Sequence, residues 1–403
     1  MIALANIIEA AERIAPIVHH TRLVFAPRMS EISGAKVYLK QENLQHTGAY
    51  KLRGAFNKIA LMSESERARG VIAASAGNHA QGVAYSARHF GIRAVIFMPE
   101  ATPLLKVSAV RRLGADVKLC GDNFDESYGA ALEYAKEHEL FFIHPFADDD
   151  VIAGQGTVGL EILREKSDMH TVILPVGGGG LISGVAALYK QMKPSVRVIG
   201  VCAQGAPAMY QSFCARAIQS CASVRTIADG IAVRDVNPKT FEYICESVDE
   251  MVCVNDEEIA DAVLYLIENQ KVVVEGAGAV GVAALLNGKI AFAQDENVAI
   301  ILSGGNIDVT MLGVIIEKGL LKSQRKMKFN VTLIDKPGSL KRLTDILSRV
   351  DANIVEINYD RTLTSLDYGD AIVTLTLETK GGAHQDAVRE ELQRHKFEIK
   401  ELL

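Results

Sequence analysis

Short apolar segments alternate with helical segments from about residue 35 to residue 305, and this alternation limits the possible folds more than any other feature of the sequence. Runs such as GVIAAS, TVILPVGGGG and VAIILSGG are typical of strands that are buried on both faces of a mostly parallel sheet. Helical segments between them, such as NHAQGVAYSARHF, supply the crossovers that parallel strands require. The sequence therefore predicts an α/β fold with open, mostly parallel sheets flanked by helices.

The pattern changes after residue 320, where a short basic stretch predicts a solvent-exposed linker over residues 321–326. Hydrophobic side chains then alternate along MKFNVTLI, as expected for a half-buried strand. An amphipathic helix, two strands, a second helix and a last strand follow in that order. The order βαββαβ predicts a ferredoxin-like domain over residues 327–403, separate from a first domain over residues 1–320.

Composition and charge exclude several classes of protein. The chain is 49% hydrophobic and 23% charged, so it can bury a large core without disulfides or metals. Its net charge of -6 gives no electrostatic case for binding nucleic acid or an anionic membrane, and its apolar runs are too short to span a bilayer. The six cysteines lack metal-ligand spacing, which favours reduced thiols in a cytoplasmic protein without a metal site.

The stretch QHTGAYKLRGAF places Lys51 next to Tyr50 among mostly small and apolar residues. A lysine that is desolvated by such neighbours has a lowered pKa, and its neutral amine can act as a nucleophile or a base. Taken alone, a solvated surface lysine is the more ordinary interpretation. The functional interpretation of Lys51 therefore depends on three further segments.

Two of these segments predict anion sites at the start of a helix. SAGNHAQG follows a buried strand, and Ser75 lies near the expected cap, so the first N–H groups of the helix suit a carboxylate. PVGGGGLISG has four consecutive glycines after a strand, which favours backbone N–H groups that wrap a phosphate. The third segment, LSGGN, places Ser303 at a strand end, where α/β sheets bind ligands. A capped helix and a flexible loop remain the alternatives.

In this order, the four segments resemble the fold type II (tryptophan synthase β-like) enzymes that depend on pyridoxal 5'-phosphate, and most closely their threonine and serine dehydratases. The resemblance covers roughly residues 5–318. It implies two sheets, with a smaller subdomain of about residues 48–147 inserted in a larger one. It also implies contacts with the cofactor: Lys51 bonds to it covalently, Tyr50 lies beside its ring, Asn78 donates to its 3-oxygen, and Ser303 contacts its pyridine nitrogen.

The remaining expected contacts follow from the same resemblance. The cofactor phosphate is expected at Gly177, Gly178, Gly179, Gly180 and Leu181. The substrate carboxylate is expected at Ser75, Ala76, Gly77, Asn78 and His79. Lys51 and Ser75 are the expected catalytic residues. Residues 327–403 resemble an ACT domain, which implies that the loop Asp335–Leu340 binds an amino-acid effector; a dimerisation module that binds nothing is the alternative.

The resemblance implies that Lys51 removes the Cα proton of L-threonine, that water leaves, and that 2-oxobutanoate and ammonia are released. L-serine is expected as a second substrate. A hydroxyl at Ser303, in place of a carboxylate, favours elimination, and Ala76 lacks the proton that racemising relatives supply from a serine at that position. A cysteine synthase-like transferase, a serine racemase and a non-catalytic amino-acid sensor remain alternatives. A homodimer or homotetramer is expected.

Two details concern single residues. Cys202 and Ala208 stand where some relatives carry carboxylates that hold a divalent cation, so we expect no such cation here, and at most a monovalent ion near Gln204. Glu275 starts a helix of small residues. It either faces the active site or caps that helix through its charge, and we favour the cap.

Overall fold

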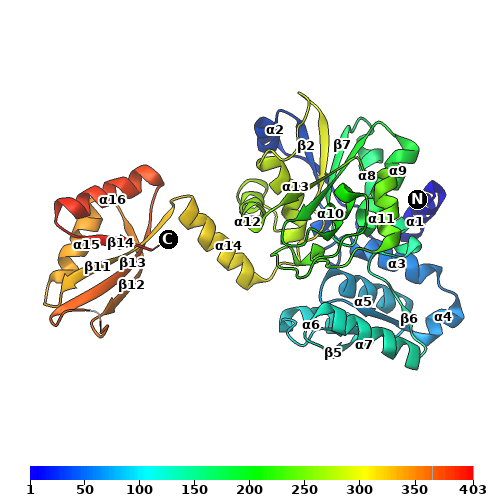
Figure 1. The fold of residues 1–403 in the computed structure, drawn as a ribbon, viewed down its shortest axis with the longest axis horizontal. Coiled ribbons are helices and arrows are strands. Elements are labelled where there is room, and N and C mark those ends of the chain that lie inside the picture. The colour runs from blue at the N-terminus through cyan, green and yellow to red at the C-terminus, as the bar shows by residue number, and fades with distance from the viewer. Residues whose placement is uncertain (365, 403) are drawn as a thin grey trace. The chain divides into compact units, whose positions relative to one another are not determined.

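The computed structural model describes residues 1–364 and 366–402, so Leu403, the end of the predicted ACT domain, lies outside the described residues. The chain divides into two compact units, Met1–Asp308 and Val309–Leu403, both drawn in Figure 1. This division differs from our boundary at residue 320 by one helix, α14 (Val309–Lys322), which it groups with the second unit. Within the described ranges, none of the helices combines the length and the apolar character needed to cross a membrane.

Two sheets form the frame of the first unit, as the alternation predicted. The larger sheet contains, in spatial order, β1 (Leu23–Phe25), β2 (Lys36–Lys40), β10 (Asn297–Ile301), β7 (Thr171–Pro175), β8 (Arg197–Ala203) and β9 (Glu250–Val254). The smaller sheet contains β5 (Asp116–Leu119), β4 (Ala94–Met98), β3 (Val71–Ala74) and β6 (Phe141–Phe142). Neighbouring strands pair in parallel, and β1 lies antiparallel to β2.

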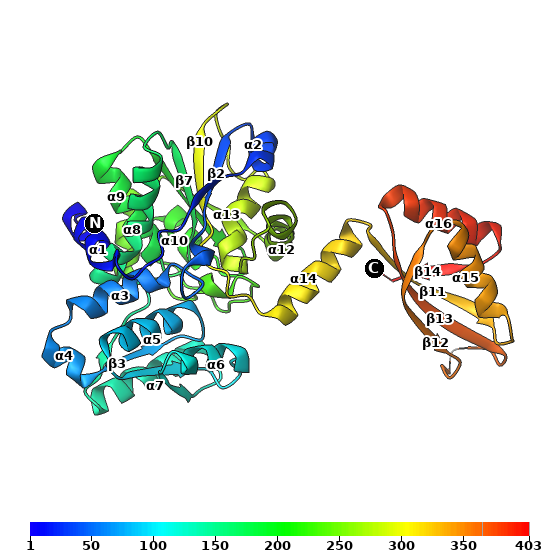
Figure 2. The same cartoon turned by 180° about the vertical axis from the view of Figure 1, so that it is seen from behind.

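Helices flank both sheets, and Figure 2 shows α5, α6 and α7 grouped around the smaller one. The bounds are α1 (Leu4–Ile14), α2 (Pro27–Ser33), α3 (Lys51–Leu61), α4 (Glu64–Arg69), α5 (Asn78–Phe90), α6 (Leu104–Arg112), α7 (Phe124–Glu137), α8 (Asp149–Glu165), α9 (Gly180–Met192), α10 (Ala208–Ala215), α11 (Pro238–Ser247), α12 (Asp256–Tyr265) and α13 (Gly276–Leu286). Three shorter turns are η1 (Glu42–Leu44), η2 (Asp229–Ile231) and η3 (Leu266–Gln270).

Glycines let α3, α8 and α9 pack backbone against backbone. A Cβ atom at Gly154 of α8 would lie 2.6 Å from the Cα atom of Gly54 on α3, and one at Gly184 of α9 would lie 2.4 Å from the carbonyl oxygen of Ile152 on α8. Atoms in a close-packed interior do not approach so closely, so larger residues would force the helices apart. These contacts set the position of α3, whose first residue is Lys51.

A buried ion cluster fixes the same end of α3. The guanidinium of Arg53 binds both carboxylate oxygens of Glu42, each at 2.8 Å, and its Nη1 lies 2.6 Å from Glu161 on α8. Lys40 of β2 lies 2.7 Å from Glu161 and 3.3 Å from Glu165. Because Arg53, Glu42 and Lys40 are fully buried, and a two-point guanidinium–carboxylate contact is directional, the cluster holds α3 against β2 and α8.

The second unit has the predicted βαββαβ order. After α14 it contains β11 (Lys326–Ile334), α15 (Ser339–Arg349), β12 (Asn353–Asp360), β13 (Asp370–Glu378), α16 (Gly382–Arg394) and β14 (Ile399–Glu401). The strands form an antiparallel sheet in the order β12-β13-β11-β14. The alternate apolar residues of β11 are buried as expected; they are Met327, Phe329, Val331 and Leu333. Only residues 323–325 lie between α14 and β11, so the expected linker 321–326 overlaps both elements.

We predict that Arg53→Met lowers the free energy of unfolding of the first unit by about 3–5 kcal/mol, because it leaves Glu42 and Glu161 buried without their cation. Chemical denaturation followed by circular dichroism measures the change. Arg88→Met, at an exposed position on α5, is the matched control and should change stability by no more than ~0.5 kcal/mol. Equal losses in the two variants would contradict the prediction.

Candidate active site

Backbone contacts join the segment before Lys51 to the end of β10. The N–H of Tyr50 donates to the carbonyl of Ser303 at 3.1 Å, and the N–H of Gly305 donates to the carbonyl of Gly48 at 2.8 Å. Gly48 has φ of +71°, and a Cβ atom there would meet the amide of Asn306 at 2.5 Å, so the position favours glycine. The structure therefore brings two of the four predicted segments together at the carboxyl edge of the larger sheet.

The amine of Lys51 lies in a partly desolvated environment. The side chain is half-buried, and its Nζ donates to the carbonyl of Pro145 at 2.8 Å and lies 5.4 Å from the centre of the Tyr50 ring. Burial lowers the pKa of Lys51 to about 8, while the negative charge of Glu275 acts in the opposite direction. A substantial share of the amine is therefore neutral near physiological pH.

Two histidines beside Lys51 stay uncharged. Burial, reinforced by the charge of Lys51, lowers the pKa of His79 to about 3 and that of His144 to about 4. The Nε2 atom of His79 lies 2.8 Å from the carbonyl of Ile143, and the Nδ1 atom of His144 accepts from the N–H of Ala147 at 2.8 Å. Of the two, only His79 was expected at the site, as a contact of the substrate carboxylate.

The glycine loop joins β7 to α9 and packs against the segment that Lys51 contacts. A Cβ atom at Gly178 would lie 2.3 Å from the Phe146 ring, and one at Gly180 would lie 2.9 Å from the Phe146 backbone. Gly179 is the N-cap of α9 with φ of +87°, and glycine has no side chain to satisfy the first N–H groups of the helix. These glycines are needed because the loop packs closely against Phe146, a reason that we did not consider at the sequence level. They also leave the first N–H groups of α9 available to an anion.

The loop after β3 differs in one detail from the expectation. We expected Ser75 near the helix cap, but α5 begins at Asn78 with Gly77 as its N-cap. Ser75 instead accepts a hydrogen bond from the N–H of Gly77 at 3.2 Å, because the chain needs two more residues to turn from the strand into the helix. Ala76 and Gly77 are half-buried in this turn, which separates the end of β3 at Ala74 from the first residue of α5, Asn78.

Glu275 lies in the site, which is the interpretation that we did not favour, and its side chain makes no hydrogen bond to its own helix. It occupies the N-cap position of α13, but its Oε1 accepts from the Nδ2 of Asn78 at 2.7 Å. The Oδ1 of Asn78 accepts in turn from Asn306 at 2.7 Å. Burial, and secondarily the charge of Asp229, raises the pKa of Glu275 to about 7.

The contacts thus connect Lys51, Tyr50, Asn78 and Ser303 at one place, and the Phe146 segment connects Lys51 to the glycine loop. Sequence reasoning did not include Glu275, Asn306 or Pro145 among the site residues. Asn306 had a signal, since it ends the LSGGN segment that was singled out. Among residues 1–364 and 366–402, the structure contains no cluster of three or more histidine, cysteine or acidic side chains suited to a metal ion.

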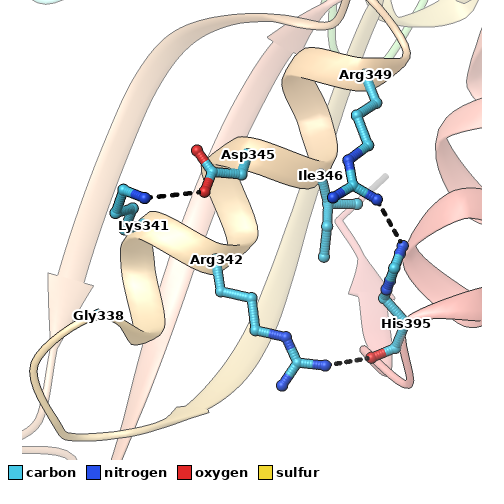
Figure 3. A pocket seen from close by; sticks show the side chains of 7 residues that line it. All are labelled: Gly338, Lys341, Arg342, Asp345, Ile346, Arg349 and His395. Atoms are coloured by element: carbon cyan, nitrogen blue, oxygen red, sulfur yellow. Dashed lines mark hydrogen bonds and ion pairs between the residues drawn. The ribbon is translucent and has the colours of Figure 1, made fainter.

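A separate pocket of about 230 Å³ lies on the second unit, between α15 and the end of α16 (Figure 3). Arg342 donates to the carbonyl of His395 at 3.4 Å, and Arg349 lies 3.2 Å from the His395 ring. The expected effector loop meets this pocket at Gly338, which has φ of +91° and precedes α15. At the start of that loop, the carboxylate of Asp335 accepts from the Tyr359 hydroxyl at 2.8 Å. The loop therefore presents the N-terminus of α15 next to basic side chains.

Comparisons with known proteins agree with this geometry. Residues 14–304 match the family model described as pyridoxal-phosphate dependent enzyme. The chain is 49% identical over 400 residues to an L-threonine ammonia-lyase of Thermotoga maritima, with 99% of both chains covered. It superimposes on threonine deaminase isoform 2 of Solanum lycopersicum with a TM-score of 0.74 at 40% identity, covering 79% of this chain and 87% of that one. It also superimposes on maize serine racemase with a TM-score of 0.75 at 35% identity, covering 80% and 99%.

We predict that Lys51 reacts with acetic anhydride at lower pH than an exposed lysine does. With a pKa of about 8, roughly one part in ten of its amine is neutral at pH 7, against less than one part in a thousand for an unperturbed lysine. Mass spectrometry of the Lys51 peptide, in the cofactor-free chain, measures the rate across pH. Lys136, exposed on α7, is the internal control, and a common pH dependence for the two peptides would refute the prediction.

Proposed function

The chain belongs to the pyridoxal-phosphate-dependent enzymes, and we propose that it is an L-threonine ammonia-lyase, which converts L-threonine to 2-oxobutanoate and ammonia. The observation that carries the proposal is the half-buried Lys51 amine, which lies between the Ser303 strand end and the glycine loop. The similarity to the Thermotoga maritima enzyme extends over both units, which supports the same activity and the same domain order. L-serine, one methyl group smaller, is proposed as a second substrate.

The residues present fit pyridoxal 5'-phosphate. The aldehyde requires a neutral amine, and Lys51 has a lowered pKa. The phosphate requires N–H donors, and the N-cap of α9, Gly179, has no side chain that would occupy the first N–H groups of the helix. We therefore assign the phosphate to Gly177, Gly178, Gly179, Gly180 and Leu181. We further assign Tyr50 and Asn78 to the ring edge, and Ser303, which is buried at the end of β10, to the pyridine nitrogen.

When bound, the cofactor supplies an electron sink for the charge that develops at the substrate Cα. Lys51 is the base that removes the Cα proton, and its low pKa lets it be neutral for that step. The first N–H groups of α5, with Ser75, Ala76, Gly77, Asn78 and His79, bind the substrate carboxylate and orient the Cα proton toward the amine. His79 is neutral, so it adds no charge that competes with this contact.

Ser303 and Ala76 direct the proposed outcome toward elimination. A hydroxyl at Ser303 would not force protonation of the pyridine nitrogen of a bound cofactor as a carboxylate would, which favours loss of a β-substituent from the substrate. Serine racemase is the second candidate, since the solved maize enzyme has a similar fold. The methyl group of Ala76 disfavours it, because a methyl group has no proton to deliver to the opposite face of Cα.

Lys51→Ala should lower 2-oxobutanoate release from L-threonine by roughly 10³-fold or more, because both the covalent attachment and the base are lost. Lys136→Ala, an exposed change on α7, should keep the wild-type rate. In wild type, borohydride should trap the cofactor on the Lys51 peptide. When L-serine is the substrate, pyruvate should form much faster than D-serine forms. A label on another lysine, or D-serine formed as fast as pyruvate, would exclude the proposed function.

We also propose that an amino acid, such as a branched-chain one, binds the second unit at the loop Asp335–Leu340 and changes the activity of the first unit. The support is the ACT-like topology and the N-terminus of α15, where backbone N–H groups suit a ligand carboxylate. We further propose that the chain forms a homodimer or homotetramer and acts in the cytoplasm. The cysteines of the described residues form no disulfides, which supports the cytoplasmic location.

Removal of residues 326–403 should abolish the response to isoleucine or valine and leave catalysis in place, because the two units are separately compact. In the full chain, binding of the effector should change the affinity for substrate by roughly 5–150-fold, the range that a coupling free energy of about 1–3 kcal/mol produces. Oxoacid release is measured with and without each amino acid. An unchanged response in the shortened chain would show that the effector binds elsewhere.

A further inference from the structure

A chain of hydrogen bonds fixes which way the Asn78 amide faces. The Nδ2 of Asn306 donates to the carbonyl of Thr47 at 2.8 Å and to the Oδ1 of Asn78 at 2.7 Å. A backbone carbonyl can only accept, so the Asn306 amide cannot be turned over without losing that bond. The Oδ1 of Asn78 must therefore face Asn306, and its Nδ2 must face Glu275, which lies 2.7 Å away.

Within residues 1–364 and 366–402, this arrangement leaves one N–H of the Asn78 amide without an acceptor. Its amide nitrogen has two N–H groups, and Glu275 accepts from one of them. Glu275 is itself held, since its N–H donates to the carbonyl of Gly304 at 3.0 Å, and a Cβ atom at Gly304 would lie 2.4 Å from its Oε1. The carboxylate thus fills the space that any larger residue at position 304 would need.

Glu275 also acts on Lys51 through its charge. The carboxylate is 4% exposed and stabilises the ammonium form of Lys51, while its own charge is opposed by Asp229 on η2 and favoured by Lys106 on α6. Lys106 and Asp229 pair with each other at 2.6 Å, so their effects on Glu275 partly cancel. His79 and His144, on which the charge of Lys51 acts, are neutral, and so is Tyr50, whose ring centre lies 5.4 Å from the Lys51 Nζ.

We propose that Glu275 is a positioning residue: with Asn306 it fixes the Asn78 amide so that a single N–H remains to donate to the 3-oxygen of the cofactor. This role rests on the proposed function, which assigns Asn78 to that oxygen. The Glu275 carboxylate also lies against Gly304, which pairs with Ala49, two residues before Lys51, so the effect of its charge on Lys51 is a part that concerns the chain alone.

Glu275→Gln tests the charge, because glutamine keeps the shape and an acceptor oxygen. Loss of the negative charge stabilises neutral Lys51, so its pKa should fall and its acetylation at pH 7 in the cofactor-free chain should be roughly twofold to fivefold faster, since a fall of one unit from a pKa of about 8 raises the neutral fraction at pH 7 from about one tenth to about one half. Glu242→Gln, an exposed change on α11, is the matched control. A Lys51 titration identical in the two variants would overturn this part.

Asn306→Asp tests the amide orientation, because a carboxylate cannot donate to the Oδ1 of Asn78. In the holoenzyme, the yellow band of the lysine-bound cofactor should weaken relative to its near-ultraviolet band, since a hydrogen bond to the 3-oxygen stabilises the yellow form. An unchanged spectrum would overturn the orientation. If wild type released no 2-oxobutanoate, the proposed function would fail by itself, and the acetylation rates would still decide whether Glu275 acts on Lys51.

Discussion

The close contact between residues 48–51 and residues 303–306 is the constraint on which the site depends. It joins segments from opposite ends of the first unit through backbone hydrogen bonds, of which Tyr50 N–H to Ser303 O, at 3.1 Å, is the one next to Lys51. The buried cluster around Arg53 holds the other side of α3. Since Lys51 is the first residue of that helix, it cannot shift without breaking one of the two sets of contacts.

The same packing determines the electrostatics. Burial disfavours the charged forms of His79, His144 and Lys51. It also disfavours the carboxylate of Glu275 and raises the pKa of that group to about 7. Near neutral pH both Glu275 and Lys51 titrate, and each charge stabilises the other. The proton content of the site therefore depends on the pair rather than on either group alone.

Local patterns predicted the fold well, and contacts between distant residues limited the prediction of the site. The strands with continuous apolar runs were recognised, as was the whole βαββαβ unit, because periodicity is a local signal. Strands β1, β2 and β9 were not singled out, since their apolar runs are short, and Lys36, Lys40 and Glu250 lie at the ends of β2 and β9. Glu275 was assigned to its own helix because its partner, Asn78, lies 197 residues away in sequence, where no local pattern reaches.

Helix α14 begins very near the site in sequence. Only Ile307 and Asp308 separate its first residue, Val309, from Asn306, whose amide binds Asn78. At its other end the helix is tied to the sheet of the second unit, where Glu317 pairs with Lys326 at 2.7 Å. Two residues of extended chain span at most roughly 7 Å, so they form a short tether with little slack.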